Sequence, residues 1–133
     1  MTSRHLEARD AEQAVLGAVL LDNSALDRVG EFLTTDDFYM PRHRHVFGTM
    51  VELSNESKPV DTVTLATILD QKKLLEEVGG MEYLASLDQI SATAVNVEHH
   101  AKIVRDLADV RRLITSCTTV IEKAQSGDYE DQE

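Results

Sequence analysis

The sequence predicts an all-α protein, a compact bundle of about five short helices followed by one long protruding helix. Two observations support this class. Apolar residues recur at intervals of three and four through most of the chain, and no alternation with a period of two persists. Cap and turn residues (Asp, Asn, Ser, Pro and Gly) also separate the periodic segments. We therefore expect helices and no sheet.

Composition limits the functions open to the chain. Its 133 residues suffice for one domain, whose core must be aliphatic because there are only three Phe, three Tyr and no Trp. The net charge of −11 disfavours autonomous binding to the phosphates of DNA. The single cysteine, Cys117, cannot form a disulfide within the chain. No long apolar run or signal peptide is present, so the chain is expected to be soluble and cytoplasmic, without a membrane partner.

The first residues, 1–9, are polar and lack periodicity, and we expect them to form a disordered arm. A globular helical bundle is expected over residues 10–95. Asp10 is expected to cap a first helix over residues 11–21, which is apolar on nearly every side and should therefore be buried at the centre. Gly17, in the middle of this helix, predicts that another helix crosses it closely.

Further helices of the bundle are expected at residues 25–33, 42–55, 62–73 and 81–90. Pro41 suits the first position of a helix, and Asp61 is expected to cap the helix that follows it. Gly79 and Gly80 are expected to end residues 74–78 and to form a turn.

A long helix is expected over residues 96–126, with Asn96 as its cap. At ~1.5 Å per residue it would be roughly 40 Å long, whereas a body of about 100 residues has a radius of gyration of only ~13 Å. The helix should therefore extend beyond the body. Residues 127–133 are expected to be an acidic loop or tail at which a longer protein has been cut.

Two apolar stripes run along this helix. The first lies in its first half and is expected to pack on the body; it consists of Val97, Ala101, Val104 and Ala108. The second follows a 3.5-residue repeat, and nothing left in the chain can cover it. We expect it to pair with another chain or with a segment absent here. The candidate interface residues are Leu107, Val110, Ile114, Cys117 and Ile121.

No metal, cofactor or catalytic site is predicted. His43 and His45 lie two residues apart on a helix and face different ways, and the adjacent His99 and His100 fail to converge for the same reason. We expect His45 to hydrogen-bond the preceding turn and the other three histidines to be solvated. The glycines also form no phosphate-binding loop.

The charged clusters have plain structural explanations. The arginines at 42–44 and 111–112 are expected to lie on solvated faces or to meet acidic patches of a partner. Asp36 and Asp37 are expected to act as caps. The alternative, in which they serve a small helical hydrolase together with a histidine, would need bound metal in the purified protein.

One ordered series of residues is more specific than these patterns. It comprises residues 12–18 (EQAVLGA), 37–39 (DFY), 59–65 (PVDTVTL) and 79–84 (GGMEYL), followed by parts of the long helix at 96–105 and 111–114. In this order and spacing, the series closely resembles the amino-terminal domain of bacterial replicative DNA helicases of the DnaB family, over about residues 11–121.

The resemblance implies a helical bundle followed by a helical hairpin, whose first arm would be the long helix. In the family, paired hairpins and bundles join subunits into a collar, a trimer of dimers on a hexameric ATPase ring, and the collar recruits primase. ATP and Mg would belong to a motor domain absent from this chain, and DNA would be reached only through the assembled ring. A helicase loader is a further candidate partner.

By position, Tyr83, Ile114 and Val120 match side chains with which the family holds primase. Plainer explanations are a core position for Tyr83 and helix packing for Ile114. The alternative to a collar domain is a free-standing acidic helical adaptor or regulatory protein. A stop codon directly after Glu133 in the native gene would favour that alternative.

Overall fold

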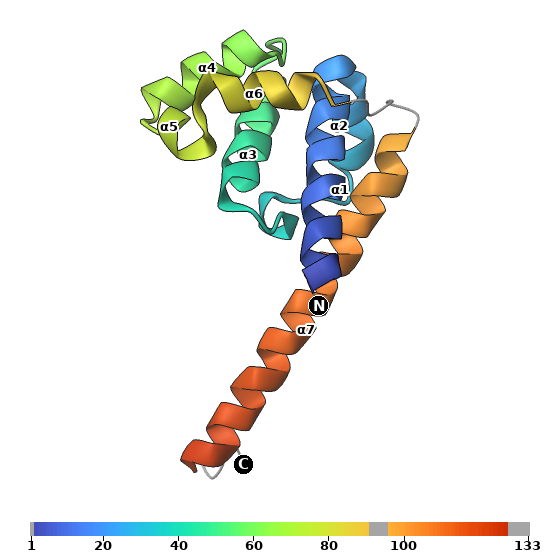
Figure 1. The fold of residues 1–133 in the computed structure, drawn as a ribbon, viewed down its shortest axis with the longest axis vertical. Helices are drawn as coiled ribbons and strands as arrows, with labels where there is room; N and C mark the ends of the chain where they lie inside the picture. Colours follow the sequence, from blue (N-terminus) through green and yellow to red (C-terminus); the bar gives the residue numbers. More distant parts are fainter. Residues whose placement is uncertain (1, 91–95, 128–133) are drawn as a thin grey trace.

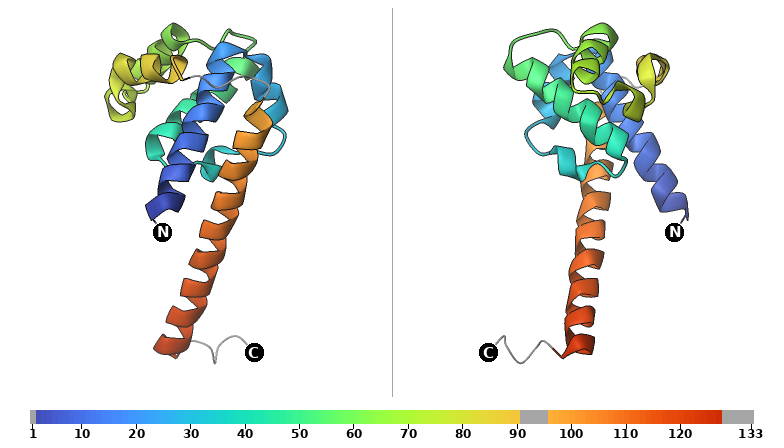
Figure 2. Two further views of the ribbon diagram at one scale, coloured as in Figure 1. Left: turned by 45° about the vertical axis from the view of Figure 1, so that its right-hand side comes forward. Right: turned by 90° about the vertical axis from the view of Figure 1, so that its left-hand side faces the viewer.

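The computed structural model describes residues 2–90 and 96–127, and in these ranges it contains helices and no strand (Figure 1). The predicted all-α class is confirmed. A body of smaller helices carries one long helix that projects from it (Figure 2). The elements are α1 (Thr2–Leu21), α2 (Ser24–Val29), the 3-10 turn η1 (Thr35–Asp37), α3 (Pro41–Asn55), α4 (Thr62–Gln71), α5 (Leu75–Val78), α6 (Gly80–Asp88) and α7 (Val97–Ser126).

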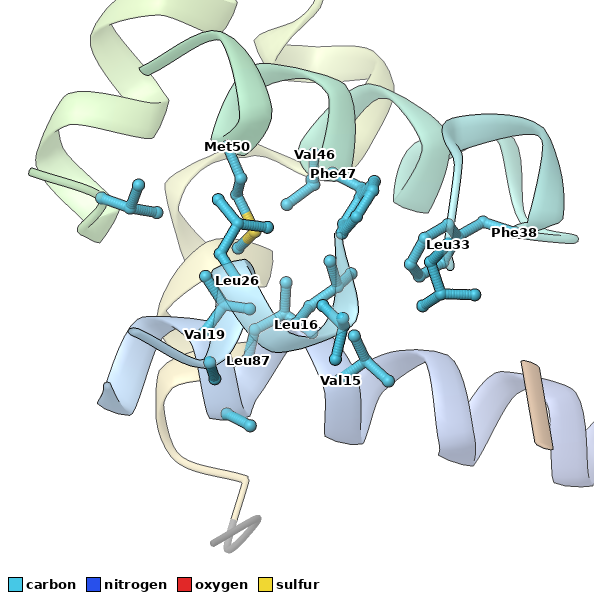
Figure 3. Close-up of a cluster of buried hydrophobic side chains, with 14 of the residues drawn as sticks. Val15, Leu16, Val19, Leu26, Leu33, Phe38, Val46, Phe47, Met50 and Leu87 are labelled. Atoms are coloured by element: carbon cyan, nitrogen blue, oxygen red, sulfur yellow. The ribbon is translucent and has the colours of Figure 1, made fainter. Parts of the chain in front are cut away.

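α1 is the central helix of the body. Val15, Leu16 and Val19 have no exposed surface, because α3, α6 and α7 all pack against α1. Figure 3 shows side chains from α1, α2, α3 and α6 meeting in one apolar cluster. A helix covered on several sides needs apolar residues all round, as its sequence indicates.

Gly17 has the close crossing that its position predicts. A Cβ added there would lie 2.8 Å from the carbonyl oxygen of Leu87, near the end of α6. Real side chains do not approach a backbone oxygen so closely, so α6 can cross α1 at this height only over a glycine.

Pro41, Asp61 and Gly79 act as the expected start and stop signals, whereas Asn96 precedes α7 without a side-chain capping hydrogen bond. Pro41 begins α3. Asp61 caps α4: its carboxylate accepts the backbone N–H of Thr64, and the Thr64 hydroxyl accepts the backbone N–H of Asp61. Gly79, with a φ of 110°, ends α5 and precedes α6. Only a glycine adopts this left-handed backbone without strain.

The expectation of a disordered arm over residues 1–9 is wrong for residues 2–9. α1 begins at Thr2, so Asp10 lies inside the helix instead of capping it. The cause is tertiary, because Ala8 and Ala11 are buried and α1 packs along α7. Local polarity does not reveal such a contact.

Other boundaries differ by less. The expected helix over 25–33 ends at Val29, and residues 74–78 hold a helix of their own, α5. The expected tail at 127–133 lies outside the described residues except for Gly127, which ends α7 with a φ of 82°.

Candidate protein-interaction surfaces

The first half of α7 is part of the body. Its buried stripe, which consists of Val97, Ala101, Val104 and Ala108, has at most 1% exposed surface. The stripe faces mainly α1, with further contacts to α2 and η1. This half of the helix is therefore fixed by the packing that the first apolar stripe predicts.

Arginine side chains fasten α7 to the chain around η1. Arg105 donates a hydrogen bond to the carbonyl oxygen of Phe32 at 2.7 Å, and Arg111 donates one to the carbonyl oxygen of Asp37 at 2.9 Å. Arg112 forms an ion pair with the buried Asp37 carboxylate. The prediction that residues 111–112 are merely solvated or await a partner is wrong, because their acceptors lie in the same chain.

The two arginines differ in their surroundings. Burial lowers the pKa of Arg111, although the nearby Glu12 charge acts in the opposite direction. The hydrogen bond to Asp37 raises the pKa of Arg112. Asp37 also accepts the backbone N–H of Thr34 at 2.9 Å, which confirms its expected capping role.

Beyond the body, α7 is open to solvent on all sides. Every residue from Arg112 to Gly127 is exposed. Among the predicted interface residues, Leu107 and Val110 are half-buried, whereas Cys117 is exposed. The large apolar side chains of this projecting segment (residues 112–126) expose more than half of their surface: Leu113 (64%), Ile114 (58%), Val120 (66%) and Ile121 (56%).

The exposed apolar side chains lie on a different side of α7 from the buried stripe. At 3.6 residues per turn, the face that continues the buried stripe becomes polar, with Thr115, Thr119 and Glu122. Ile114 and Ile121 lie roughly a third of a turn away from it. A partner of the projecting segment must therefore approach from a side that the body leaves free.

A second candidate surface surrounds Tyr83 on α6. The Tyr83 hydroxyl lies 2.5 Å from Nε2 of His43 and accepts a hydrogen bond from the Gln13 amide at 3.2 Å. Nδ1 of His43 lies 2.6 Å from the buried Glu12 carboxylate. That carboxylate also accepts the backbone N–H groups of the two residues before Pro41. A continuous polar path thus joins α1, α3 and α6 through the body.

Sequence reasoning missed this path and misplaced two histidines. His43, expected to be solvated, has no exposed surface. His45, expected to bond the preceding turn, instead lies 3.7 Å from Glu77. A signal was present: His43 is three residues before Val46 and four before Phe47, which places it on the apolar face of α3.

The remaining candidates form no chemical site in the part of the chain that the structure describes. No cluster of three His, Cys, Asp or Glu side chains there could hold a metal ion. The rings of His99 and His100 meet edge to face, and burial lowers the pKa of the half-buried His100. None of the described helices has the length and apolarity needed to span a membrane.

The three residues matched to primase docking fall on two surfaces. Tyr83 is half-buried in the body, whereas Ile114 and Val120 lie on the exposed projecting segment. A single partner that touches all three must bridge the body and the long helix.

Comparison with known proteins places these surfaces in context. A family model described as the DnaB-like helicase N-terminal domain matches residues 4–106. Over 118 residues (89% of the chain), the sequence is 45% identical to the replicative DNA helicase DnaC of Bacillus subtilis and 43% identical to the replicative DNA helicase DnaB of Geobacillus stearothermophilus. It spans 25% of the length of each of these relatives.

Solved structures agree in fold. The N-terminal domain of DnaB helicase from Mycobacterium tuberculosis superposes with a TM-score of 0.86 at 39% identity, covering 90% of this chain and 85% of that one. The corresponding domain from Helicobacter pylori superposes with a TM-score of 0.79 at 22% identity, covering 93% and 96%. Because the family model covers more than half of the sequence, this chain belongs to the family of DnaB-like helicase N-terminal domains.

Proposed function

We propose that this chain is the amino-terminal collar domain of a replicative hexameric DNA helicase. In this role it joins subunits and docks primase, and it performs no catalysis itself. ATP hydrolysis with Mg and the movement along DNA belong to a motor domain elsewhere in the whole protein. Family membership and the names of the curated relatives support the proposal.

The observation that carries the assembly role is the exposed apolar side of α7. A single chain leaves Ile114 and Ile121 more than half exposed on the projecting segment of α7. Burying one exposed Ile side chain contributes about 1.5–3 kcal/mol of favourable free energy. Pairing two such helices would bury these side chains from both chains and so favours association. Cys117 lies between these two residues, and Leu107 and Val110 extend the same interface toward the body. We propose that this interface is used in a dimer and in a trimer of dimers.

Primase docking is supported by the H. pylori domain, whose structure is described together with its interactions with primase. In this chain, Tyr83, Ile114 and Val120 are the proposed contacts. Assembly would bring the projecting segment of one subunit near the body of another, which lets one primase molecule meet both surfaces. A helicase loader is a further proposed partner.

The assembly role is tested by sedimentation velocity on the full-length protein. The double substitution Ile114→Asp with Ile121→Asp should weaken association about 100-fold or more, because it places charge in an apolar contact of each subunit. The matched control is Thr115→Asp with Thr119→Asp, which adds the same charge on the polar side of the same segment and should retain the hexamer.

Primase docking is tested by titration calorimetry with the helicase-binding domain of the cognate primase. Tyr83→Ala and Val120→Ala should each weaken binding without changing the sedimentation coefficient. If the unmodified hexamer binds no primase, the proposed docking role is wrong. In the sedimentation experiment, equal association of the Ile114→Asp/Ile121→Asp and Thr115→Asp/Thr119→Asp variants would contradict the proposed assembly interface.

A further inference from the structure

The Tyr83 hydroxyl forms its hydrogen bonds with residues of the body. When Nδ1 of His43 donates to the Glu12 carboxylate, Nε2 is free to accept the Tyr83 O–H, and the phenolic oxygen accepts the Gln13 amide. Both ring nitrogens of His43 and the Tyr83 hydroxyl then have partners inside the body. A protein that docks here meets the ring of Tyr83 and not a free hydroxyl.

Arg42 lies over that ring. Its guanidinium carbon is 4.7 Å from the ring centroid of Tyr83, a distance typical of cation–π contact. Gly79 makes room for the pair, since a Cβ at Gly79 would lie 2.7 Å from Cβ of Tyr83 and 3.7 Å from Nη1 of Arg42. The network below the ring and the glycine beside it hold the Arg42–Tyr83 pair in one place.

Arg42 has no hydrogen-bond acceptor or ion-pair partner among residues 2–90 and 96–127. Arg44, Arg111 and Arg112 differ, because each donates to a carbonyl or carboxylate oxygen of the body. A guanidinium presents five N–H donors in a plane that fits a carboxylate. Stacking on an aromatic ring orients that plane without using the donors.

We propose that Arg42, stacked on Tyr83, is a receptor for a carboxylate side chain of the docked protein partner. This inference rests on the proposed docking of primase and names one chemical feature of that contact: an Asp or Glu of the primase domain that forms a paired hydrogen bond with the Arg42 guanidinium while its neighbours cover the Tyr83 ring. A phosphate of DNA is the less suitable anion, because DNA is a polyanion and the whole chain carries a net charge of −11, whereas a protein partner presents a single carboxylate to Arg42.

The test is a charge exchange between the two proteins, measured by calorimetry with the helicase-binding domain of the cognate primase. Arg42→Glu should weaken primase binding about tenfold. Arg42→Lys should weaken it less, because lysine keeps the positive charge but loses the paired N–H donors of the guanidinium. Lys102→Glu is the matched control, since it makes the same change of charge at an exposed position of α7. Its affinity for the primase domain should stay within about twofold of that of the unmodified chain. Single Asp→Lys and Glu→Lys variants of the primase domain are then titrated against the unmodified chain and against the Arg42→Glu protein.

One primase variant should bind the Arg42→Glu protein more tightly than it binds the unmodified chain. The proposed carboxylate contact is wrong if Arg42→Glu and Lys102→Glu weaken primase binding equally. It is also wrong if no Asp→Lys or Glu→Lys variant of the primase domain restores binding to the Arg42→Glu protein. In either case the docking of primase itself still stands. If the unmodified chain binds no primase, the docking proposal itself fails. A single-stranded DNA oligonucleotide that loses affinity with Arg42→Glu, in place of primase, would assign the site to nucleic acid and overturn the inference.

Discussion

The Glu12 carboxylate is the acceptor at the centre of the body. It receives three donors, two of them backbone N–H groups that precede α3 and the third Nδ1 of His43. Glu12→Gln replaces one acceptor oxygen by an NH₂ group, which faces a donor and leaves it unpaired. We expect a loss of about 1.5–3 kcal/mol in the free energy of unfolding, measured by urea denaturation. Glu31→Gln, at an exposed position, should change this free energy little.

Gly17 gives a second prediction at this scale. Gly17→Ala gains about 1 kcal/mol of helix propensity, but its methyl group would sit 2.8 Å from a backbone oxygen of α6. Forcing the helices apart typically costs about 1–3 kcal/mol, so the midpoint of thermal unfolding should fall. Gly48→Ala in α3 is the matched substitution, because its Cβ meets only a methyl carbon of Thr35 at 3.3 Å. A larger loss at Gly48 than at Gly17 would contradict this account.

Single residues show where sequence reasoning succeeds and where it stops. Spacing correctly separates His43 from His45, yet it does not say which of the two lies inside. The register of Val46 and Phe47 carries that information, because it fixes the inner face of α3. The partner of His43, by contrast, comes from α1, and the position of Glu12 beside the apolar run of residues 14–21 only signals that some buried donor must exist.

At the scale of elements, the contact between α1 and α7 predicts a pH dependence. His100 on α7 borders a shallow hollow together with Asp10 and Ala11 of α1. Burial, and to a lesser degree the charge of His99, lower the pKa of His100 in the folded state. The unfolded chain therefore binds the proton more readily, and this residue's contribution to stability falls as the pH drops below about 6.5, its ordinary value.

His100→Gln should consequently lose less stability than the unmodified chain when the pH is lowered from about 7 to 5.5. Thermal unfolding followed by circular dichroism at both pH values gives the comparison. His99→Gln removes only the smaller cause and should show a weaker change in the same direction. A steeper loss of stability in His100→Gln than in the unmodified protein would reverse the sign and refute the assignment.

Elements were predictable where their signals are local. Pro41, Asp61 and Gly79 mark boundaries through their own backbone chemistry, and the structure confirms all three. The start of α1 was missed because α1 packs on α7, which is distant in sequence, and the local polarity of residues 2–9 does not reveal that contact. The anchoring of 111–112 to η1 was missed for the same reason, since spacing on one helix contains no information about a carbonyl on another.

For the whole molecule, the two stripes of α7 divide the helix into parts with different stability. The first part is held by buried apolar side chains and by Arg105, Arg111 and Arg112. From Leu113 onward the projecting segment has neither, and an isolated helix of about 15 residues is marginal in water. We therefore expect it to be stabilised by a second helix that covers Ile114 and Ile121, as the proposed assembly requires. The sequence predicted this exposed side of α7 correctly, because the 3.5-residue apolar repeat continues past the part of α7 that packs on the body.

Hydrogen exchange can measure that division directly. In dilute solution, where sedimentation velocity finds monomers, the amides of residues 112–126 should exchange close to the rate of an unfolded peptide, while those of residues 101–110 stay protected. As the concentration rises and the chain associates, protection should extend along the projecting segment, because the paired helix can no longer fray. Ile114→Asp should abolish this concentration dependence and leave residues 101–110 unchanged. Strong protection of 112–126 in a proven monomer would mean that the segment is stable alone, and the physical reason for association would be lost.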